Sequence, residues 1–258
     1  MTDQLHSVRE GRLLRLTLNR PEKRNALDTA LCRTLLDALD DAAADPAVGA
    51  ILLIANGRAF CAGMDLAEIE QDGRAAEIDA LHERLFTIGA RLAKPLIAGV
   101  QGPVLGGGVG LVANCHIVVA GPEADFGLTE IRLGLWPFLV HRAVAGALGE
   151  RRTLELSLTG RIFSAAEAFQ FGLVHEVCDG AAVRACEIAR TVAGFSPMAI
   201  QSGMAFVQRV RGLGRQDADA IARDARSQVF AGDDFREGIR AFREKRSPRW
   251  PSLGEQKV

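Results

Sequence analysis

The chain has 258 residues, of which 48% are hydrophobic, and its formal net charge at pH 7 is −1. This balance of charge gives no reason to expect bulk attraction to nucleic acid or to an acidic membrane surface. No run of 18 apolar residues predicts a transmembrane helix, and the first residues lack the charged start and apolar stretch of a secretory signal. The five cysteines are odd in number and without metal-ligand spacing, which favours reduced thiols in a cytoplasmic protein.

Strands and helices alternate in the predicted order of elements up to about residue 140. Continuous apolar runs predict buried strands at residues 12–18, 48–55, 96–100 and 117–120. Apolar residues at helical spacing predict helices at residues 27–42, 66–92 (looser near Asp72-Gly73) and 108–113. This alternation is typical of parallel βαβ units in an α/β protein.

The last part of the chain has a different, helical pattern. Helices are predicted at residues 142–147, 152–158, 165–171, 181–193, 197–210, 217–230 and 233–245. One short strand is predicted at residues 173–177.

A glycine run, Leu105–Gly110, lies between the strand at 96–100 and the helix at 108–113. Glycine lacks a Cβ, so another group can approach its backbone closely, and free N–H groups at a helix start favour negative charge. A nucleotide phosphate loop would end in Gly-Lys-Ser/Thr, whereas Gly110 is followed by Leu111 and Val112. A plain loop or close helix packing remains an alternative to an anion site.

The segment Ala59–Leu66 also follows a predicted strand and precedes a predicted helix. Two such turns, each offering one backbone N–H group, would form an oxyanion hole if their N–H groups converged. The alternative is two ordinary connections in which glycine serves turn geometry.

Five groups of residues, in this order, together resemble the crotonase family, the enoyl-CoA hydratase/isomerase superfamily. They are Asn19-Arg20-Pro21 with Asn25-Ala26-Leu27; Ala59–Leu66; Gly106-Gly107-Gly108; Phe126–Gly134; and Leu158-Thr159-Gly160 with Ala165–Ala168 and Gly172-Leu173-Val174. The resemblance implies a spiral ββα core that binds acyl-CoA over residues 1–195. Residues 196–258 would form a helical region that caps coenzyme A and builds a trimer or a dimer of trimers. It also implies acyl-CoA thioester substrates, with no metal and no redox cofactor.

The resemblance also assigns site residues by motif position. The N–H groups of Met64 and Gly107 would form the oxyanion hole, and Glu130 would be the catalytic acid/base. Residues that would contact the substrate or its coenzyme A are Arg24, Ala26, Ala62, Gly63, Gly106, Phe138, Phe242 and Lys245. Phe138 would help to exclude water.

One departure from the family pattern concerns the reaction. Hydratases of the family carry a second glutamate just after the glycine run, and that position is Gly110 here. A single carboxylate can move a proton from C2 to C4 without water, so the resemblance favours an enoyl-CoA isomerase with Glu130 as sole acid/base. The alternatives are a 2-enoyl-CoA hydratase that uses Glu130 plus another acid, and a non-catalytic binding scaffold. The other acids considered are Glu68, Glu70, Glu77 and Asp125, and two histidines, His82 and His141, are further candidate bases.

Overall fold

The core of the protein is a six-stranded sheet with the order β1-β2-β3-β4-β6-β9, seen in a computed structural model that describes residues 4–69 and 75–254. The strands are β1 (Leu5–Glu10), β2 (Leu13–Leu18), β3 (Ala50–Ala55), β4 (Leu96–Val100), β6 (Ile117–Ala120) and β9 (Glu176–Val177). β1 and β2 form an antiparallel hairpin, and the other neighbours are parallel. The four predicted apolar strands and the α/β class are confirmed. β1 has no apolar run because it is an edge strand with mostly exposed side chains.

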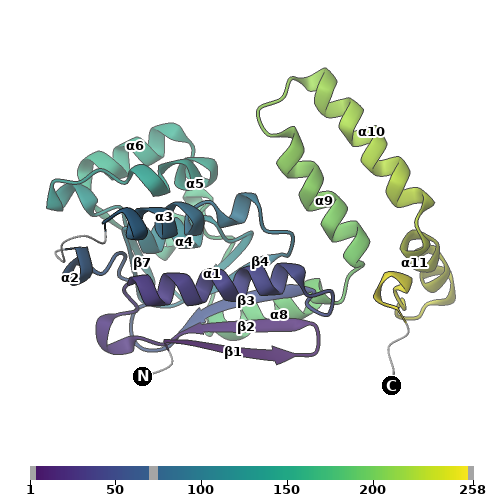
Figure 1. Cartoon of the computed structure of the whole chain (residues 1–258), viewed down its shortest axis with the longest axis horizontal. Coiled ribbons are helices and arrows are strands. Elements are labelled where there is room, and N and C mark those ends of the chain that lie inside the picture. Colours follow the sequence, from purple (N-terminus) through teal and green to yellow (C-terminus); the bar gives the residue numbers. More distant parts are fainter. Residues whose placement is uncertain (1–3, 70–74, 255–258) are drawn as a thin grey trace.

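Helices cover both faces of this sheet, which explains why β3 and β4 are continuously apolar. On one face, alanines of α8 (Ala181–Ala193) pack against Leu52 of β3 and Ile97 of β4. On the other face, leucines of α1 (Thr29–Ala44) share a core with Leu53, the next residue of β3. Figure 1 shows α1 and α8 on opposite sides of the strands.

A second, three-stranded sheet has the order β5-β7-β8. Its strands are β5 (Pro103–Leu105), β7 (Asp125–Gly127) and β8 (Ile162–Ser164). Three residues are too few to show a periodic pattern, so these strands were not predicted. This sheet positions the glycine run and Glu130. β5 leads into α4 (Gly107–Ala113), and β7 leads into the 3₁₀ helix η3 (Glu130–Leu133).

The predicted helix at residues 66–92 is divided. The structure has α2 (Leu66–Ile69), α3 (Ala75–Leu85) and a 3₁₀ turn, η2 (Ile88–Ala90); the looser section near Asp72-Gly73 lies outside the described residues. Farther on, α5 (Phe138–Leu148) begins four residues before its predicted start, and α6 (Glu150–Thr159) and α7 (Ala165–Phe171) follow.

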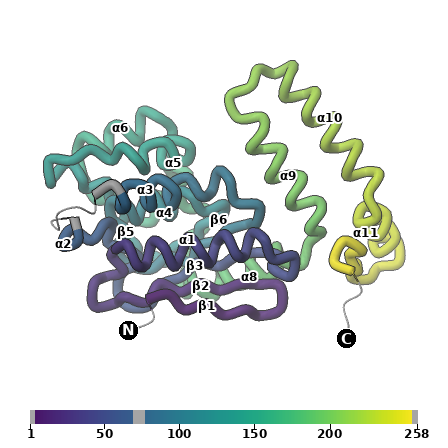
Figure 2. Tube along the Cα trace, viewed as in Figure 1, coloured from purple at the N-terminus to yellow at the C-terminus, as the bar shows by residue number. Residues whose placement is uncertain are grey.

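The C-terminal helices stand apart from the sheet. They are α9 (Pro197–Val210), α10 (Arg215–Ala231) and α11 (Asp233–Glu244), and α9 and α10 pack against each other as they extend away from the core (Figures 1 and 2). Large apolar side chains on this region are exposed: Phe195, Met198, Val207, Phe230 and Phe242. Across both described ranges, no helix combines the length and apolar character needed to cross a membrane.

Candidate active site

The two strand-end segments predicted to act together lie side by side. Cys61 and Val104 form a parallel bridge, and the Leu105 N–H donates to the Cys61 carbonyl at 2.9 Å. A Cβ placed on Gly63 would lie 2.8 Å from the Leu105 carbonyl oxygen and 3.3 Å from the Gly107 nitrogen. Residues 61–64 therefore run directly beside the turn that starts α4.

Hydrogen bonds to Leu27, on the side of residues 61–64 opposite the α4 turn, fix the direction of the Met64 N–H. The Leu27 N–H donates to the Gly63 carbonyl at 2.8 Å, and the Asp65 N–H donates to the Leu27 carbonyl at 3.1 Å. In a trans peptide the carbonyl and the N–H point in opposite directions. Since the Gly63 carbonyl points to Leu27, the Met64 N–H points away from it, toward the side where β5 and α4 lie.

The Gly107 N–H is the first of α4. The first N–H groups of a helix have no partner within the helix, and no carbonyl in the described ranges accepts from either Gly107 or Met64. Gly106, which precedes the helix, has φ +52° and donates its own N–H to Gly127 at 2.8 Å. The arrangement leaves two backbone donors free at one junction, as the geometry of an oxyanion hole requires.

Glu130 lies against the same turn. Its side chain is buried, with the residue 8% exposed, and a Cβ on Gly106 would lie 3.3 Å from Glu130 Oε1. Oε2 is buried without a hydrogen-bond partner among the described residues. Burial, which penalises the charged form, raises the pKa of Glu130, while its own backbone N–H lowers that pKa to a smaller extent. A carboxyl of raised pKa beside a pair of free amides suits proton transfer.

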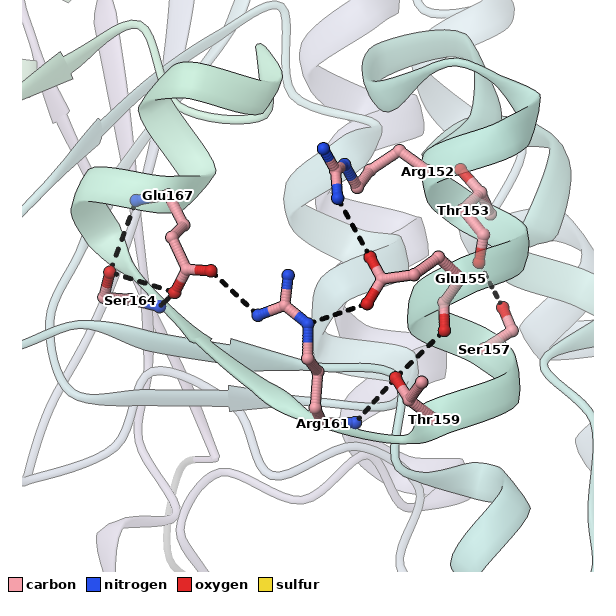
Figure 3. Close-up of polar contacts among 8 residues, drawn as sticks. All are labelled: Arg152, Thr153, Glu155, Ser157, Thr159, Arg161, Ser164 and Glu167. Atoms are coloured by element: carbon pink, nitrogen blue, oxygen red, sulfur yellow. Dashed lines mark hydrogen bonds and ion pairs between the residues drawn. The ribbon is translucent and has the colours of Figure 1, made fainter.

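A polar network outside the site anchors the strand next to the Glu130 segment. Arg161, which precedes β8, donates from Nε to Glu155 at 2.8 Å and from Nη1 to Glu167 at 2.8 Å. It thereby joins the middle of α6 to the first turn of α7, where Glu167 also completes a capping box with Ser164 (Figure 3). β8 pairs with β7, the strand that leads to Glu130, so this network holds the small sheet from its outer side.

Gly110 stands at the position where the resemblance places the second glutamate of hydratases. The space beside it is filled by an apolar side chain. A Cβ on Gly110 would lie 2.7 Å from Val140 Cβ, on α5, and 3.2 Å from Phe86 Cδ1. Both neighbours are buried. The ring of Phe86 also reaches Gly107, where a Cβ would lie 2.9 Å from Cζ. This face of α4 is therefore walled by apolar groups.

The other predicted contact residues are only partly gathered here. Gly63 and Gly106 lie at the junction described above. The Ala62 N–H donates to the Arg24 carbonyl at 3.0 Å, and the Arg24 side chain is exposed. The Ala26 carbonyl accepts from Arg20 at 2.6 Å, so one of its two lone pairs is already in use.

Three predicted aromatic or basic contact residues have exposed side chains in the single chain. Phe138 is 73% exposed. Val140, two residues on, makes the inward contact with α4 in the single chain, and the exclusion of water by Phe138 stays a prediction. Phe242 is 85% exposed on α11, and Lys245 ends that helix. Figure 1 shows α11 well away from α4.

The alternative acids that the structure describes have other partners or are exposed. Glu68 accepts from the Thr29 N–H at 2.7 Å, Glu77 pairs with Arg33, and Asp125 is exposed. Glu70 lies outside the described residues. Across residues 4–69 and 75–254, no group of three or more His, Cys, Asp or Glu side chains is arranged to hold a metal ion.

The two candidate histidines differ. His141 lies 3.2 Å from Glu150 on the surface. His82 is buried beside Phe86, with 5.4 Å between the ring centroids, and burial lowers its pKa. Sequence reasoning missed Phe86, in the turn after α3, and Val140, on α5, as wall residues, because an apolar side chain gives no signal of the site it faces.

Comparison with known proteins identifies the family of the chain. The sequence profile of the family described as "Enoyl-CoA hydratase/isomerase" matches residues 9–253. An enoyl-CoA hydratase of Mycobacterium tuberculosis, EchA19, is 38% identical over 254 residues, covering 93% of each chain. The 2,3-dehydroadipyl-CoA hydratase of Escherichia coli is 36% identical, covering 93% of this chain and 95% of its own.

A solved structure shows the same architecture. The enoyl-CoA hydratase of Mycobacterium smegmatis superimposes with a TM-score of 0.89 at 31% identity, covering 96% of this chain and 98% of the other. Fold and site thus define an α/β enzyme of the acyl-CoA class. The chain belongs to the enoyl-CoA hydratase/isomerase family, with the crotonase fold.

Proposed function

We propose that this protein is an enoyl-CoA isomerase that converts 3-enoyl-CoA to 2-enoyl-CoA, with Glu130 as its single acid/base. The observation that carries the proposal is the apolar packing at Gly110, where Val140 and Phe86 take the space of a second acid. A double-bond shift requires a proton to leave C2 and a proton to reach C4, and one carboxylate can do both. The reaction is redox-neutral and uses coenzyme A only as part of the substrate.

In the proposed mechanism, the Glu130 carboxylate takes a proton from C2. The electron pair of the broken C–H bond spreads over the dienolate, and negative charge develops on the thioester oxygen. The Met64 and Gly107 N–H groups stabilise that charge as it forms. Glu130, now neutral in its buried setting, returns the proton at C4 while the double bond moves to C2–C3. The raised pKa of Glu130 favours the first step, since it makes the carboxylate a stronger base.

Hydration of a 2-enoyl-CoA is the second candidate, and the names of the relatives favour it. The Mycobacterium tuberculosis and Escherichia coli proteins cited above are both named as hydratases. In this reaction Glu130 would have to activate water for attack at C3 and also supply the proton to C2. Against hydration, Glu68 and Glu77 are engaged with Thr29 and Arg33, and Asp125 is exposed.

Product analysis in heavy water distinguishes the two reactions. Given a short 3-enoyl-CoA such as 3-hexenoyl-CoA, the protein is expected to form 2-enoyl-CoA without accumulating 3-hydroxyacyl-CoA. Mass spectrometry would measure both products and their deuterium content. Rapid formation of 3-hydroxybutyryl-CoA from crotonyl-CoA would instead establish the hydratase.

Restoring the absent glutamate is expected to require two substitutions. Gly110→Glu alone should lower stability by about 1–3 kcal/mol, because its side chain would overpack against Val140, and it should not create hydration. Gly110→Glu with Val140→Gly opens that space and is expected to add crotonyl-CoA hydration. The measurements are melting temperature and 3-hydroxybutyryl-CoA formation, with Val140→Gly alone as control. Efficient hydration by the single Gly110→Glu variant would show that Val140 does not limit the reaction.

We further propose a homo-oligomer, a trimer or a dimer of trimers, in which α9–α11 contact neighbouring subunits. The exposed apolar side chains of this region, including Phe195 and Phe230, support it because isolated chains rarely leave such a surface uncovered. Phe242 and Lys245 would then reach the coenzyme A of a neighbour rather than of their own chain.

A further inference from the structure

Arg20 lies two residues after the end of β2, directly before the 3₁₀ turn at Pro21–Lys23, and has no part in the proton transfer described above. It is 8% exposed, and its guanidinium has three acceptors. Nη1 donates to the Ala26 carbonyl at 2.6 Å, and Nη2 lies 3.1 Å from Asp28 Oδ2 and 3.0 Å from Asp65 Oδ2. A charged group this buried must be paired to be tolerated.

These acceptors surround one structural feature, the bridge between Leu27 and Met64. Ala26 and Asp28 are the neighbours of Leu27 in the chain. Asp65 follows Met64 directly, and its own N–H closes the bridge by donating to Leu27 at 3.1 Å. The Arg20 guanidinium therefore ties together the two segments whose pairing sets the direction of the Met64 N–H.

The backbone of the loop after Arg20 is held by Asn25. Asn25 is fully buried and has φ +53°, a conformation that asparagine adopts more readily than most residues. Its Oδ1 accepts from the Arg20 N–H at 2.7 Å, and its Nδ2 donates to the Asn56 and Ala59 carbonyls at 2.9 Å each. Ala59 belongs to the segment that leads to Met64, so this loop is fastened to the strand end as well.

We propose that Arg20 is a positioning residue for the Met64 amide: its planar, forked guanidinium, held by Asp28 and Asp65, sets the direction of one of the two oxyanion donors. This inference rests on the oxyanion role given to Met64 in the proposed function. A lysine in place of Arg20 retains the charge but cannot reach Ala26, Asp28 and Asp65 with a planar fork. Arg20→Lys is therefore expected to keep most of the folding while misdirecting the Met64 amide.

The test measures polarisation of a bound thioester directly. Butyryl-CoA labelled with ¹³C at the carbonyl is bound to each variant, and isotope-edited infrared spectroscopy records the carbonyl frequency. In the wild type, hydrogen bonds from Met64 and Gly107 are expected to lower that frequency relative to the free ligand. Arg20→Lys and Asp65→Asn should lose a large part of this shift and lower kcat about ten- to a hundredfold, the effect expected of a misplaced rather than a deleted donor.

The control is Arg12→Lys, at the other end of β2. Arg12 donates from Nε to the Ala193 carbonyl at 2.9 Å, so its substitution removes a comparable buried contact without touching the Leu27–Met64 bridge. It is expected to lower the melting temperature while leaving the carbonyl shift and kcat unchanged. Melting curves of all variants separate loss of folding from loss of polarisation.

The outcomes separate the two proposals. If the wild type itself shows no carbonyl shift, the oxyanion role of Met64 and Gly107 is wrong. If the wild type shows the shift and folded Arg20→Lys and Asp65→Asn variants retain it in full, Arg20 is structural only and the positioning proposal is wrong. Loss of the shift in both variants, but not in Arg12→Lys, supports it.

Discussion

Replacement of Glu130 by glutamine is expected to reduce turnover by about 10²–10⁴-fold, the contribution typical of a general acid/base. Acyl-CoA binding should persist, because the amide is nearly isosteric and the backbone donors at Met64 and Gly107 are untouched. Steady-state kinetics with a 3-enoyl-CoA and calorimetric titration with butyryl-CoA would measure the two effects. Unchanged turnover would remove Glu130 from the mechanism.

The same substitution is expected to raise stability at neutral pH. Burial raises the pKa of folded Glu130 above its unfolded value, so the folded state binds this proton more tightly than the unfolded state does. The associated stability is present at acidic pH and is lost as pH rises through the folded pKa. Glutamine stays neutral and does not suffer this loss. The melting temperature of Glu130→Gln should exceed that of the wild type at pH 7–8, by about 2–4 °C for each kcal/mol gained, and the difference should shrink toward acidic pH.

An exposed acid nearby provides the control for this pH effect. Asp125 lies on β7, the strand that leads to Glu130, and its side chain is exposed. Asp125→Asn is expected to change neither turnover nor the pH dependence of melting by more than a small amount. If the melting temperatures of Glu130→Gln and the wild type differ by the same amount at acidic and neutral pH, burial of the charge is not the cause of the difference.

The second large effect is expected from Gly63→Ala. Gly63 has φ +90°, and an added Cβ would lie 2.8 Å from the Leu105 carbonyl oxygen and 3.3 Å from the Gly107 nitrogen. The new methyl group would push residues 61–64 away from the start of α4 and separate the Met64 and Gly107 N–H groups, the two proposed oxyanion donors. We expect kcat to fall about 10²–10³-fold, as when one such donor is lost, together with a lower melting temperature.

Gly11→Ala separates backbone strain from the steric effect. Gly11 has φ +61° in the turn between β1 and β2, and an added Cβ there would meet nothing within 4 Å. This variant should lose stability of about 1 kcal/mol and keep full activity. Equal kcat values for Gly11→Ala and Gly63→Ala would show that the junction of the two segments does not support catalysis.

The buried parallel core was predictable because its strands are apolar on both faces. The apolar runs of β3 and β4 meet α1 on one side and α8 on the other, so the pattern in the sequence directly reflects burial. Only those candidate site residues that stand in sequence motifs could be predicted. Met64, Gly107 and Glu130 stand in recognisable segments, and the structure brings those segments to one junction.

What escaped prediction depends on contacts between elements distant in sequence. Val140 fills the space beside Gly110 from another helix, and neither residue alone indicates the other. Arg20 was visible within a motif, but its three acceptors lie in segments that only the folded chain assembles. The resemblance assigned Phe138 a role in excluding water, and that role stays a prediction, since its side chain is exposed in the single chain and Val140 makes the inward contact with α4.

Because both proposed oxyanion donors belong to the main chain, only a change to proline, which has no backbone N–H group, would remove either of them. Any other substitution can act on the thioester oxygen only by shifting the backbone, whereas the residues at positions 110, 130 and 140 are free to change. Related enzymes can thus keep the proposed activation of the thioester while the reaction catalysed next to it changes. Related enzymes that form different products are therefore expected to differ in the side chains that face α4. They are expected to share the backbone conformation of residues 61–64 and 105–107.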